Sequence, residues 1–316
     1  MKITNSELTG YIYGALTVKE HNGFINFERM SAKQFEITDS LHPVIRNAAR
    51  VNASVTLEMI TDAKSVCFDC IFAEMDTEYD TLDILCNGVI VKTFDLGGIK
   101  KGKVVHFTAE LPEGADKHLS VYMPSDGFCE IANFEICATY VKQVAKGERI
   151  MFIGDSITQG YGPYVTSLTY VNIFGRLGNY DIFNQGIGGY YYDERFAVPL
   201  NRPAPDRVII AFGTNQINSA DKAERVKEFY KKFVPLYPNA KITVITPIWR
   251  CDSAANITNL LELSKAIRNT CSEYNIPVID GFTLVPNSPK YFKDGLHPNV
   301  AGCLRYAQNL YSAIKG

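Results

Sequence analysis

The feature that most constrains the fold is an alternation of short apolar runs with helical patterns over residues 149–316. The run Arg207-Val-Ile-Ile-Ala-Phe212 is apolar throughout its interior, as a strand buried on both faces requires. Apolar residues at helical spacing follow it, for example Val226, Phe229 and Phe233. Strands are expected at residues 149–153, 180–184, 207–212, 241–246 and 276–280. Strands joined by helices form a parallel sheet covered on both faces, so we expect an α/β fold with a three-layer, doubly wound, flavodoxin-like sheet.

Residues 1–145 show a different pattern, with short strands and no long helical period. Asn87-Gly88 stands between two alternating apolar runs, which is the strongest short-range signal for a β-hairpin. Strands are expected at residues 53–60, 65–72, 82–86, 89–94, 103–109, 118–123 and 129–140. This spacing indicates a β-sandwich of the jelly-roll type. We therefore expect a β-sandwich accessory domain over residues 1–145 and a catalytic domain over residues 146–316, with a linker around Val144–Glu148.

Composition excludes several classes of function. The net charge is -2, which offers no global field for nucleic acid or an anionic membrane, and no apolar run approaches the roughly 18 residues of a membrane span. We therefore expect no nucleic-acid partner and no membrane association, while the oligomeric state has no signal in the sequence. The eight cysteines lack zinc-finger spacing, and Cys67 and Cys70 fall on opposite faces of an expected strand. Free cysteines and an N-terminus without the apolar core of a signal peptide predict a cytoplasmic protein.

Polar residues follow the expected strands at their carboxyl ends, where diverging loops leave a crevice for ligands. Ser156 follows the first strand, Asn215 follows the third, and Asp294 and His297 lie beyond the fifth. A spacing of three puts Asp294 and His297 on one face of a helical turn. The carboxylate can then hold one imidazole nitrogen while the other faces Ser156, as nucleophile, base and orienting acid require. The alternative interpretation of residues 294–298 is a turn that caps the last helix.

Four segments, taken in order, resemble the SGNH hydrolases, which are also called GDSL-type esterases and lipases. These segments are Gly154-Asp155-Ser156, Asn184-Gln-Gly-Ile-Gly-Gly189, Gly213-Thr-Asn215 and Asp294-Gly-Leu-His297. Their order and spacing agree over the whole of residues 149–316. The N-terminal half resembles the β-sandwich that precedes the catalytic domain in some carbohydrate esterases of this group.

The resemblance implies a catalytic triad in which Ser156 attacks an ester carbonyl, His297 takes the serine proton and Asp294 orients His297. It implies an oxyanion hole made of the backbone N–H groups of Ser156 and Gly189 and the side-chain amide of Asn215. It implies neither a metal nor a cofactor. A neighbouring carboxylate raises the pKa of a histidine, so we expect activity that rises through roughly pH 6 to 8.

Aromatic residues near these segments favour a sugar ester as the substrate. Tyr190 follows the Gly-rich turn, Tyr161 follows Ser156 by five residues, and Trp249 ends the fourth expected strand. Aromatic rings with polar tips suit sugar rings, although all three could also serve as packing. We expect a serine esterase that removes short acyl groups, above all acetyl, from a small-molecule or oligosaccharide ester.

The sequence leaves three alternatives open. The first is a thioesterase or lysophospholipase of the same superfamily, and the second is a non-catalytic carbohydrate-binding protein. The third is a nucleotide or flavin binder. The turn at Gly154–Gly162 disfavours the third alternative, because it lacks the lysine of a P-loop and carries Asp155.

Overall fold

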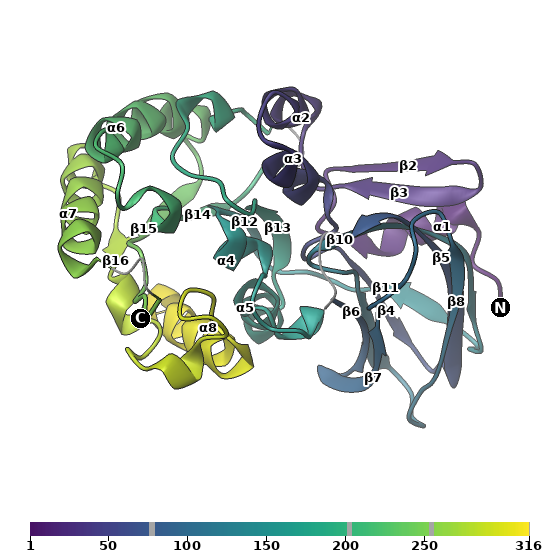
Figure 1. The fold of residues 1–316 in the computed structure, drawn as a ribbon. Helices are drawn as coiled ribbons and strands as arrows, with labels where there is room; N and C mark the ends of the chain where they lie inside the picture. The colour runs from purple at the N-terminus through teal and green to yellow at the C-terminus, as the bar shows by residue number, and fades with distance from the viewer. Residues whose placement is uncertain (76–79, 201–203, 253–255, 316) are drawn as a thin grey trace.

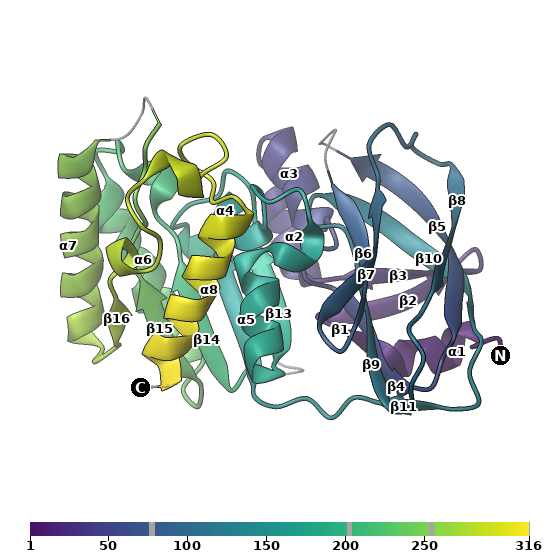
Figure 2. The ribbon, with the colours of Figure 1, turned by 90° about the horizontal axis from the view of Figure 1, so that it is seen from below.

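A computed structural model describes residues 1–75, 80–200, 204–252 and 256–315. In Figure 1 the N-terminal strands (purple and blue) lie to one side of the molecule, and a sheet with helices around it (teal to yellow) lies to the other. The second view, in Figure 2, shows the same division, with α2 and α3 between the two parts.

The strands after residue 148 form one parallel sheet in the order β13-β12-β14-β15-β16. Their bounds are β12 Arg149–Gly154, β13 Asp181–Gly186, β14 Arg207–Ala211, β15 Lys241–Ile245 and β16 Val278–Ile279. In chain order this is 2-1-3-4-5, the doubly wound order that the strand–helix alternation predicts. The strand β13 therefore forms the edge that faces the N-terminal part of the chain.

Helices cover both faces of this sheet. They are α4 Ser156–Gln159, α5 Tyr170–Gly178, α6 Lys222–Phe233, α7 Ile257–Glu273 and α8 Val300–Lys315. Side chains of β12 alternate between the two faces. Met151 and Ile153 enter a core with α6 and α7, whereas Ile150 and Phe152 enter a core with α5 and α8. The C-terminal part is thus an α/β fold of three layers.

The N-terminal strands form two antiparallel sheets. One has the order β1-β4-β9-β6-β7 with β11 beside β4, and the other has the order β2-β3-β10-β5-β8. The bounds of the first sheet are β1 Ile12–Tyr13, β4 Thr56–Thr61, β6 Thr81–Cys86, β7 Val89–Asp95, β9 Lys117–Tyr122 and β11 Val141–Gln143. Those of the second are β2 Thr17–His21, β3 Phe24–Glu28, β5 Ser65–Met75, β8 Val104–Glu110 and β10 Gly127–Ile136. One apolar core, with Leu57, Phe68 and Val121 among its members, is shared by both sheets.

The hairpin at Asn87-Gly88 is confirmed. The strands β6 and β7 pair on either side of it, and the two turn residues have φ values of 50° and 77°. Positive φ at both central residues is the requirement of a type I′ turn, which Asn-Gly meets with little strain.

Three N-terminal helices are not anticipated by the sequence pattern: α1 Asn5–Leu8, α2 Ala32–Asp39 and α3 Pro43–Arg50. Each is too short to show a clear apolar period, although the capping box of Ser31 and Gln34 marks the start of α2. Met30, Ala48 and Ala49 belong to the core that α6 and α7 share with the parallel sheet. The N-terminal part of the chain therefore completes one face of the parallel sheet.

Arg29 links the two parts through a fully buried side chain. Its side chain is 1% exposed, and it donates to the carbonyls of Val51 at 2.7 Å, Asn184 at 2.8 Å, Gly186 at 2.7 Å and Ala48 at 2.5 Å. Burial lowers the pKa of the guanidinium to about 9, so the group is still charged at neutral pH. Hydrogen bonds from a charged donor are roughly twice as strong as neutral ones. A single side chain thus joins the N-terminal segment to the carboxyl end of β13.

None of the helices within the described ranges combines the length and the apolar character that a membrane span needs.

Replacing Arg29 by Met should lower the free energy of unfolding by at least about 3 kcal/mol, because four buried carbonyls lose a charged donor. Urea denaturation measures this change. Arg305→Met on the exposed face of α8 is the matched control and should change stability little. Equal stability of the two variants would contradict the role given to Arg29.

Candidate active site

Ser156 is the first residue of α4, directly after β12. Asp155 caps the helix, since its Oδ1 accepts the N–H of Ile157 at 3.1 Å. The first N–H groups of a helix have no carbonyl partner within the helix, so α4 leaves the Ser156 N–H unused. Ser156 itself is partly exposed, although its neighbours on both sides are buried. The hydroxyl is therefore accessible at the carboxyl edge of the sheet.

His297 and Asp294 lie next to Ser156. The Ser156 Oγ is 2.8 Å from His297 Nε2, and His297 Nδ1 is 2.8 Å from Asp294 Oδ2. The other carboxylate oxygen, Oδ1, accepts the backbone N–H of Leu296 at 3.0 Å and of His297 at 2.8 Å. This side-chain turn holds the pair together. The helical turn expected at this spacing is wrong, because residues 293–297 form a bend closed by the bridge between Phe292 and Pro298.

A hydrogen bond joins the segments that carry Gly189 and Asn215. The Tyr190 N–H donates to Ile187 O at 3.1 Å, which closes a turn with Gly189 at φ 75°. Only glycine adopts this left-handed backbone readily. The Asn215 side-chain amide donates to Tyr190 O at 2.8 Å. One N–H of that amide is thus fixed against the glycine turn, and the second N–H is left for another acceptor.

The segments that carry Ser156, Gly189 and Asn215 are also linked pairwise through α4. Gly188 N–H donates to Gln159 Oε1 at 2.7 Å, which ties the glycine turn to the end of α4. The N–H of Thr214 donates to the buried Asp155 carboxylate, which ties the Asn215 segment to the start of α4. A Cβ at Gly186 would overlap the backbone of Gln159, so glycine is needed where α4 crosses the end of β13. The four sequence segments therefore form one hydrogen-bonded site.

Gln159 connects this site to the antiparallel sheets, a role that sequence reasoning missed. Its Nε2 donates to Asp126 Oδ1 at 2.7 Å and to Ser125 O at 3.3 Å. The loop that presents these groups is held in turn by the buried Asp80, whose Oδ2 accepts the Asp126 N–H at 2.7 Å. A glutamine three residues after the Gly154–Ser156 segment carries no signal of such a contact, because its partners are distant in the sequence.

Arg250 is a second residue that sequence reasoning missed. Its Nη1 donates to Thr214 O at 2.8 Å, and its Nη2 pairs with Asp252 Oδ2 at 2.6 Å. The next residue, Cys251, donates its N–H to Gly295 O at 2.6 Å. The loop after β15 thereby braces both the Asn215 segment and the Asp294–His297 bend.

Burial moves two ionisable groups of the site toward their neutral forms. It lowers the pKa of His297 below its usual value of 6.5, and outweighs the Asp294 carboxylate, which acts in the opposite direction. Burial also raises the pKa of Asp155 to about 7. For Asp294, burial acts to raise the pKa, but hydrogen bonds from the backbone and imidazole of His297 outweigh it and the pKa is lowered. The expectation of a raised histidine pKa is therefore wrong, because burial of the ring exceeds the effect of one carboxylate.

Of the three aromatic residues proposed to touch substrate, only Tyr161 contacts the triad. Its ring meets the His297 ring edge-on, with centroids 4.6 Å apart, and the Lys293 ammonium lies 4.4 Å from its centre. Trp249 is partly exposed, stacks on Phe282 at 3.8 Å and donates its indole N–H to the Phe282 carbonyl. Its known contacts are therefore those of packing.

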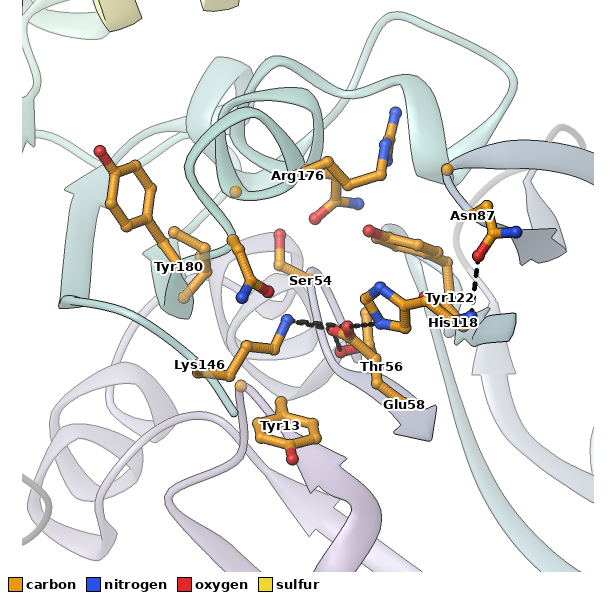
Figure 3. Close-up of a pocket in the computed structure, with 17 residues that line it drawn as sticks. Tyr13, Ser54, Thr56, Glu58, Asn87, His118, Tyr122, Lys146, Arg176 and Tyr180 are labelled. Atoms are coloured by element: carbon orange, nitrogen blue, oxygen red, sulfur yellow. Dashed lines mark hydrogen bonds and ion pairs between the residues drawn. The ribbon is translucent and has the colours of Figure 1, made fainter. Parts of the chain in front are cut away.

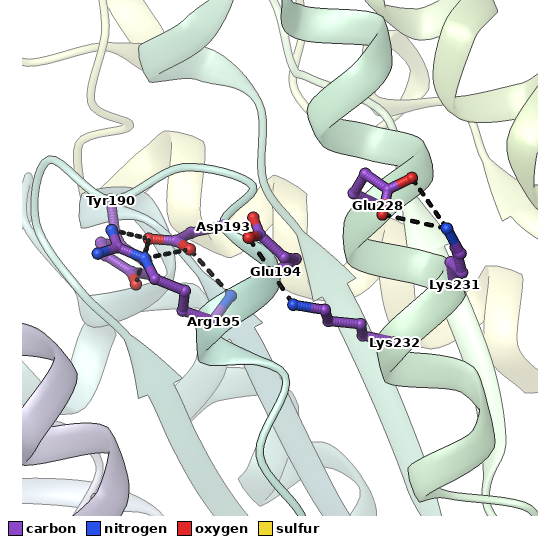
Figure 4. Close-up of polar contacts among 7 residues, drawn as sticks. All are labelled: Tyr190, Asp193, Glu194, Arg195, Glu228, Lys231 and Lys232. Carbon is purple, nitrogen blue, oxygen red and sulfur yellow. Dashed lines mark hydrogen bonds and ion pairs between the residues drawn. The ribbon is translucent and has the colours of Figure 1, made fainter.

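The prediction that the Tyr190 side chain touches substrate is wrong. Its ring is 0% exposed and lies in the core beneath the glycine turn, where Phe196 and Phe212 surround it. Figure 4 shows its hydroxyl directed to Asp193, which also forms a two-pronged ion pair with Arg195. A side chain fixed in this way cannot reach a ligand, so Tyr190 contributes only its carbonyl, which holds Asn215.

A known protein family matches the C-terminal part of the chain. Residues 152–304 match the model of the GDSL-like lipase/acylhydrolase family. No curated protein sequence is significantly similar to the chain.

Solved structures resemble the chain across both of its parts. A protein from Bacteroides ovatus described as a GDSL-like lipase aligns with a TM-score of 0.76 at 18% identity, over 100% of this chain and 97% of its own. A salicylyl-acyltransferase from a tetracycline biosynthetic pathway aligns with a TM-score of 0.77 at 17% identity, over 96% and 94%. An acetyl xylan esterase from Butyrivibrio proteoclasticus aligns with a TM-score of 0.66 at 14% identity, over 100% and 98%. At these identities the similarity shows the fold.

The lowered pKa of His297 predicts how ester cleavage by this site depends on pH. Neutral imidazole is the form that accepts a proton, so kcat/KM should rise with pH and level off once His297 is neutral. The midpoint of this rise should lie below about pH 6.5, because burial lowers the pKa of His297. The measurement is p-nitrophenyl acetate hydrolysis between pH 4.5 and 8.5, combined with an NMR titration of the His297 ring. A midpoint above 7 would contradict the burial argument.

Two variants serve as controls for this profile. Asp155→Asn keeps an oxygen to cap α4 but removes a carboxyl whose pKa is about 7. Because His297 and not Asp155 is expected to set the pH profile, the midpoint of this variant should match that of the wild type. Asp294→Asn removes the charge that favours imidazolium, so its midpoint should fall further.

Gln159→Leu should lower kcat for ester cleavage by about 10- to 100-fold and leave KM nearly unchanged, because the Gly188 N–H loses the acceptor that sets the glycine turn. Steady-state kinetics and circular dichroism of the folded variant measure this effect. Gln308→Leu, at an exposed position of α8, is the matched control. A Gln159→Leu enzyme with normal kcat would show that the turn keeps its geometry without this bond.

Proposed function

We propose that this chain is a serine esterase, because residues 152–304 match the model of the GDSL-like lipase/acylhydrolase family. Its reaction is the hydrolysis of short-chain acyl esters, above all acetyl esters of carbohydrates. The observation that carries the proposal is the pair of 2.8 Å hydrogen bonds that run from Ser156 through His297 to Asp294. A nucleophile, a base and an orienting acid in this arrangement support acyl transfer through a covalent intermediate.

The reaction has two halves. Ser156 Oγ attacks the carbonyl carbon of the ester while His297 Nε2 accepts the serine proton, and the tetrahedral intermediate then expels the alcohol, which takes that proton from His297. A water molecule attacks the acyl-enzyme in the second half, with His297 again as base, and the carboxylic acid and free Ser156 are the products. Asp294 holds the opposite ring nitrogen throughout, which selects the tautomer and stabilises the imidazolium.

The oxyanion of each tetrahedral intermediate is bound by the backbone N–H groups of Ser156 and Gly189 and by the Asn215 amide. The hydrogen bond from Asn215 to Tyr190 O supports this role, because it fixes the amide plane before substrate arrives. A donor set in advance costs no reorganisation during the reaction, and each such donor contributes about 3 kcal/mol to lowering the barrier.

A carbohydrate ester is supported by the groups around His297. Tyr161 and Tyr164 share the Lys293 ammonium, which lies 4.4 Å from the centre of each ring. Aromatic surface beside a hydrogen-bond donor suits the C–H faces and hydroxyls of a sugar. One structure that resembles the chain is an acetyl xylan esterase, which supports acetyl as the acyl group.

We also infer that residues 1–145 form an accessory β-sandwich of the jelly-roll type and residues 146–316 the catalytic domain. The shared core of the two antiparallel sheets supports this division. The accessory domain is also part of the catalytic machinery, because Arg29 and Asp126 hold the strand end and the glutamine that shape the site. The stability of Arg29→Met tests this dependence.

Ser156→Ala and His297→Ala should each lower kcat/KM by at least about 1,000-fold without loss of folding, because each removes a group that forms or breaks bonds. Asp294→Asn should cost less, since it removes only the orienting charge. Hydrolysis of p-nitrophenyl acetate measures the loss, and Ser312→Ala on the exposed face of α8 is the matched control. Near-normal activity of folded Ser156→Ala protein would refute the serine mechanism.

The substrate class is tested by kcat/KM on p-nitrophenyl esters from acetate to decanoate and on acetylated xylo-oligosaccharides. We expect the highest values for acetyl esters and measurable release of acetate from the oligosaccharides. Efficiency that rises steadily with chain length, without activity on acetylated sugars, would instead favour a thioesterase or lysophospholipase. A folded protein that cleaves none of these esters would indicate a non-catalytic carbohydrate-binding protein.

A further inference from the structure

A second polar cavity of about 260 Å³ lies between the two parts of the molecule, away from Ser156. Its walls come from β4 and β9 of the antiparallel sheets, from α5, and from Tyr180 and Ile182 at the beginning of β13. Ser156 lies past the opposite, carboxyl end of the strand paired with β13. The cavity is therefore a site distinct from the candidate active site, and ligand binding in it does not depend on the proposed esterase activity.

One wall of this cavity is a sheet face that is both polar and covered. In the register of β4 and β9, Thr56 pairs with Tyr122 and Glu58 pairs with Ser120, so these four side chains share a face. Their alternating neighbours, such as Leu57, enter the apolar core instead. Each of the four is only 4–5% exposed; Arg176 of α5 lies over the Tyr122 ring, and Lys146 and His118 contact Glu58. Polar residues on a covered face are the exception among buried surfaces and call for a chemical reason.

Glu58 is the most costly of these groups to bury, and its neighbours keep it ionised. Lys146 Nζ lies 2.7 Å from each carboxylate oxygen, His118 Nε2 lies 2.6 Å from one of them, and Thr56 Oγ1 donates at 2.8 Å. Burial acts to raise the pKa of Glu58, but the hydrogen bonds from His118 and Lys146 and the Lys146 charge outweigh it, and the pKa falls to about 2. A buried ion pair of this kind adds little net stability, yet it fixes donors and acceptors in place.

The cavity floor is strained. Ser54 has φ 61°, a left-handed conformation that costs a serine free energy, and its side chain accepts the Asn184 amide at 3.0 Å. Its own hydroxyl proton is thereby left for another acceptor. Figure 3 shows Ser54, His118, Tyr122 and Lys146 directed into the same space. Strain, a buried charge and convergent polar groups together indicate a binding site.

We propose that this cavity binds one sugar acid, a polyhydroxylated ring that carries a single carboxylate. Serine and tyrosine hydroxyls and the rings of Tyr13 and Tyr122 suit the hydroxyls and C–H faces of a sugar. Lys146 pairs with Glu58. Arg176 donates to the Ser167 carbonyl at 2.7 Å and lies 5.3 Å from the centre of the Tyr122 ring, so among the lining residues its positive charge has no carboxylate partner and is left for the ligand. The volume is below the roughly 300–1,000 Å³ of pockets for drug-sized molecules, which limits the occupant to about one ring.

The test is isothermal titration of the full-length protein with glucuronate, glucose and acetate, at ligand concentrations suited to a Kd of about 1 mM. We expect glucuronate to bind, glucose to bind about tenfold more weakly because it lacks the charge, and acetate to give no heat. No binding of any of the three would refute the proposal. Equal binding of glucose and glucuronate would refute the acid preference, and equal binding of acetate would show a simple anion site.

Substitutions in the cavity test whether glucuronate binds there. Ser120→Leu fills the cavity and should abolish glucuronate binding, whereas Tyr161→Ala beside His297 should leave it unchanged. Arg176→Met, on the partly exposed side of α5, should lower glucuronate affinity about tenfold toward that of glucose and stays informative if Ser120→Leu does not fold. Binding that survives both cavity variants in folded protein would overturn the assignment.

Discussion

The buried guanidinium of Arg29 joins the two parts of the structure through four hydrogen bonds. It donates to two carbonyls of its own segment, those of Ala48 and Val51, and to two at the end of β13, those of Asn184 and Gly186. A cation without water is tolerated here because four carbonyl dipoles replace its hydration. The consequence is that the edge of the parallel sheet and the glycine turn after it are held by a residue of the N-terminal part.

The candidate site is a closed set of hydrogen bonds around α4. Asp155 holds the Thr214 N–H, Gln159 holds the Gly188 N–H, and Asn215 holds Tyr190 O. Burial has opposite effects on the pKa values of Asp155 and His297, but in both cases it favours the neutral form. A site with little net charge suits a neutral ester and a histidine that must begin as a neutral base.

The two parts of the chain meet through polar contacts as well as apolar ones. Near Ser156, Asp126 binds Gln159, and at the beginning of β13 the covered face of β4 and β9 surrounds the second cavity. Such polar contacts set geometry more than stability, because most of their gross energy offsets the loss of water. The N-terminal part of the chain therefore contacts α4 of the candidate site directly, through the hydrogen bond between Asp126 and Gln159.

The parallel sheet, its 2-1-3-4-5 order and the meeting of Ser156 and His297 could be predicted from the sequence, because strand periodicity and the right-handed crossover rule bring the carboxyl ends of the strands to one edge of the sheet. The hairpin at Asn87-Gly88 could be predicted for the same reason, since two residues decide their own φ. Only the tertiary structure decided the burial of Tyr190, the lowered pKa of His297 and the roles of Arg29 and Gln159. Each depends on desolvation or on a partner distant in the chain, and no local pattern encodes either.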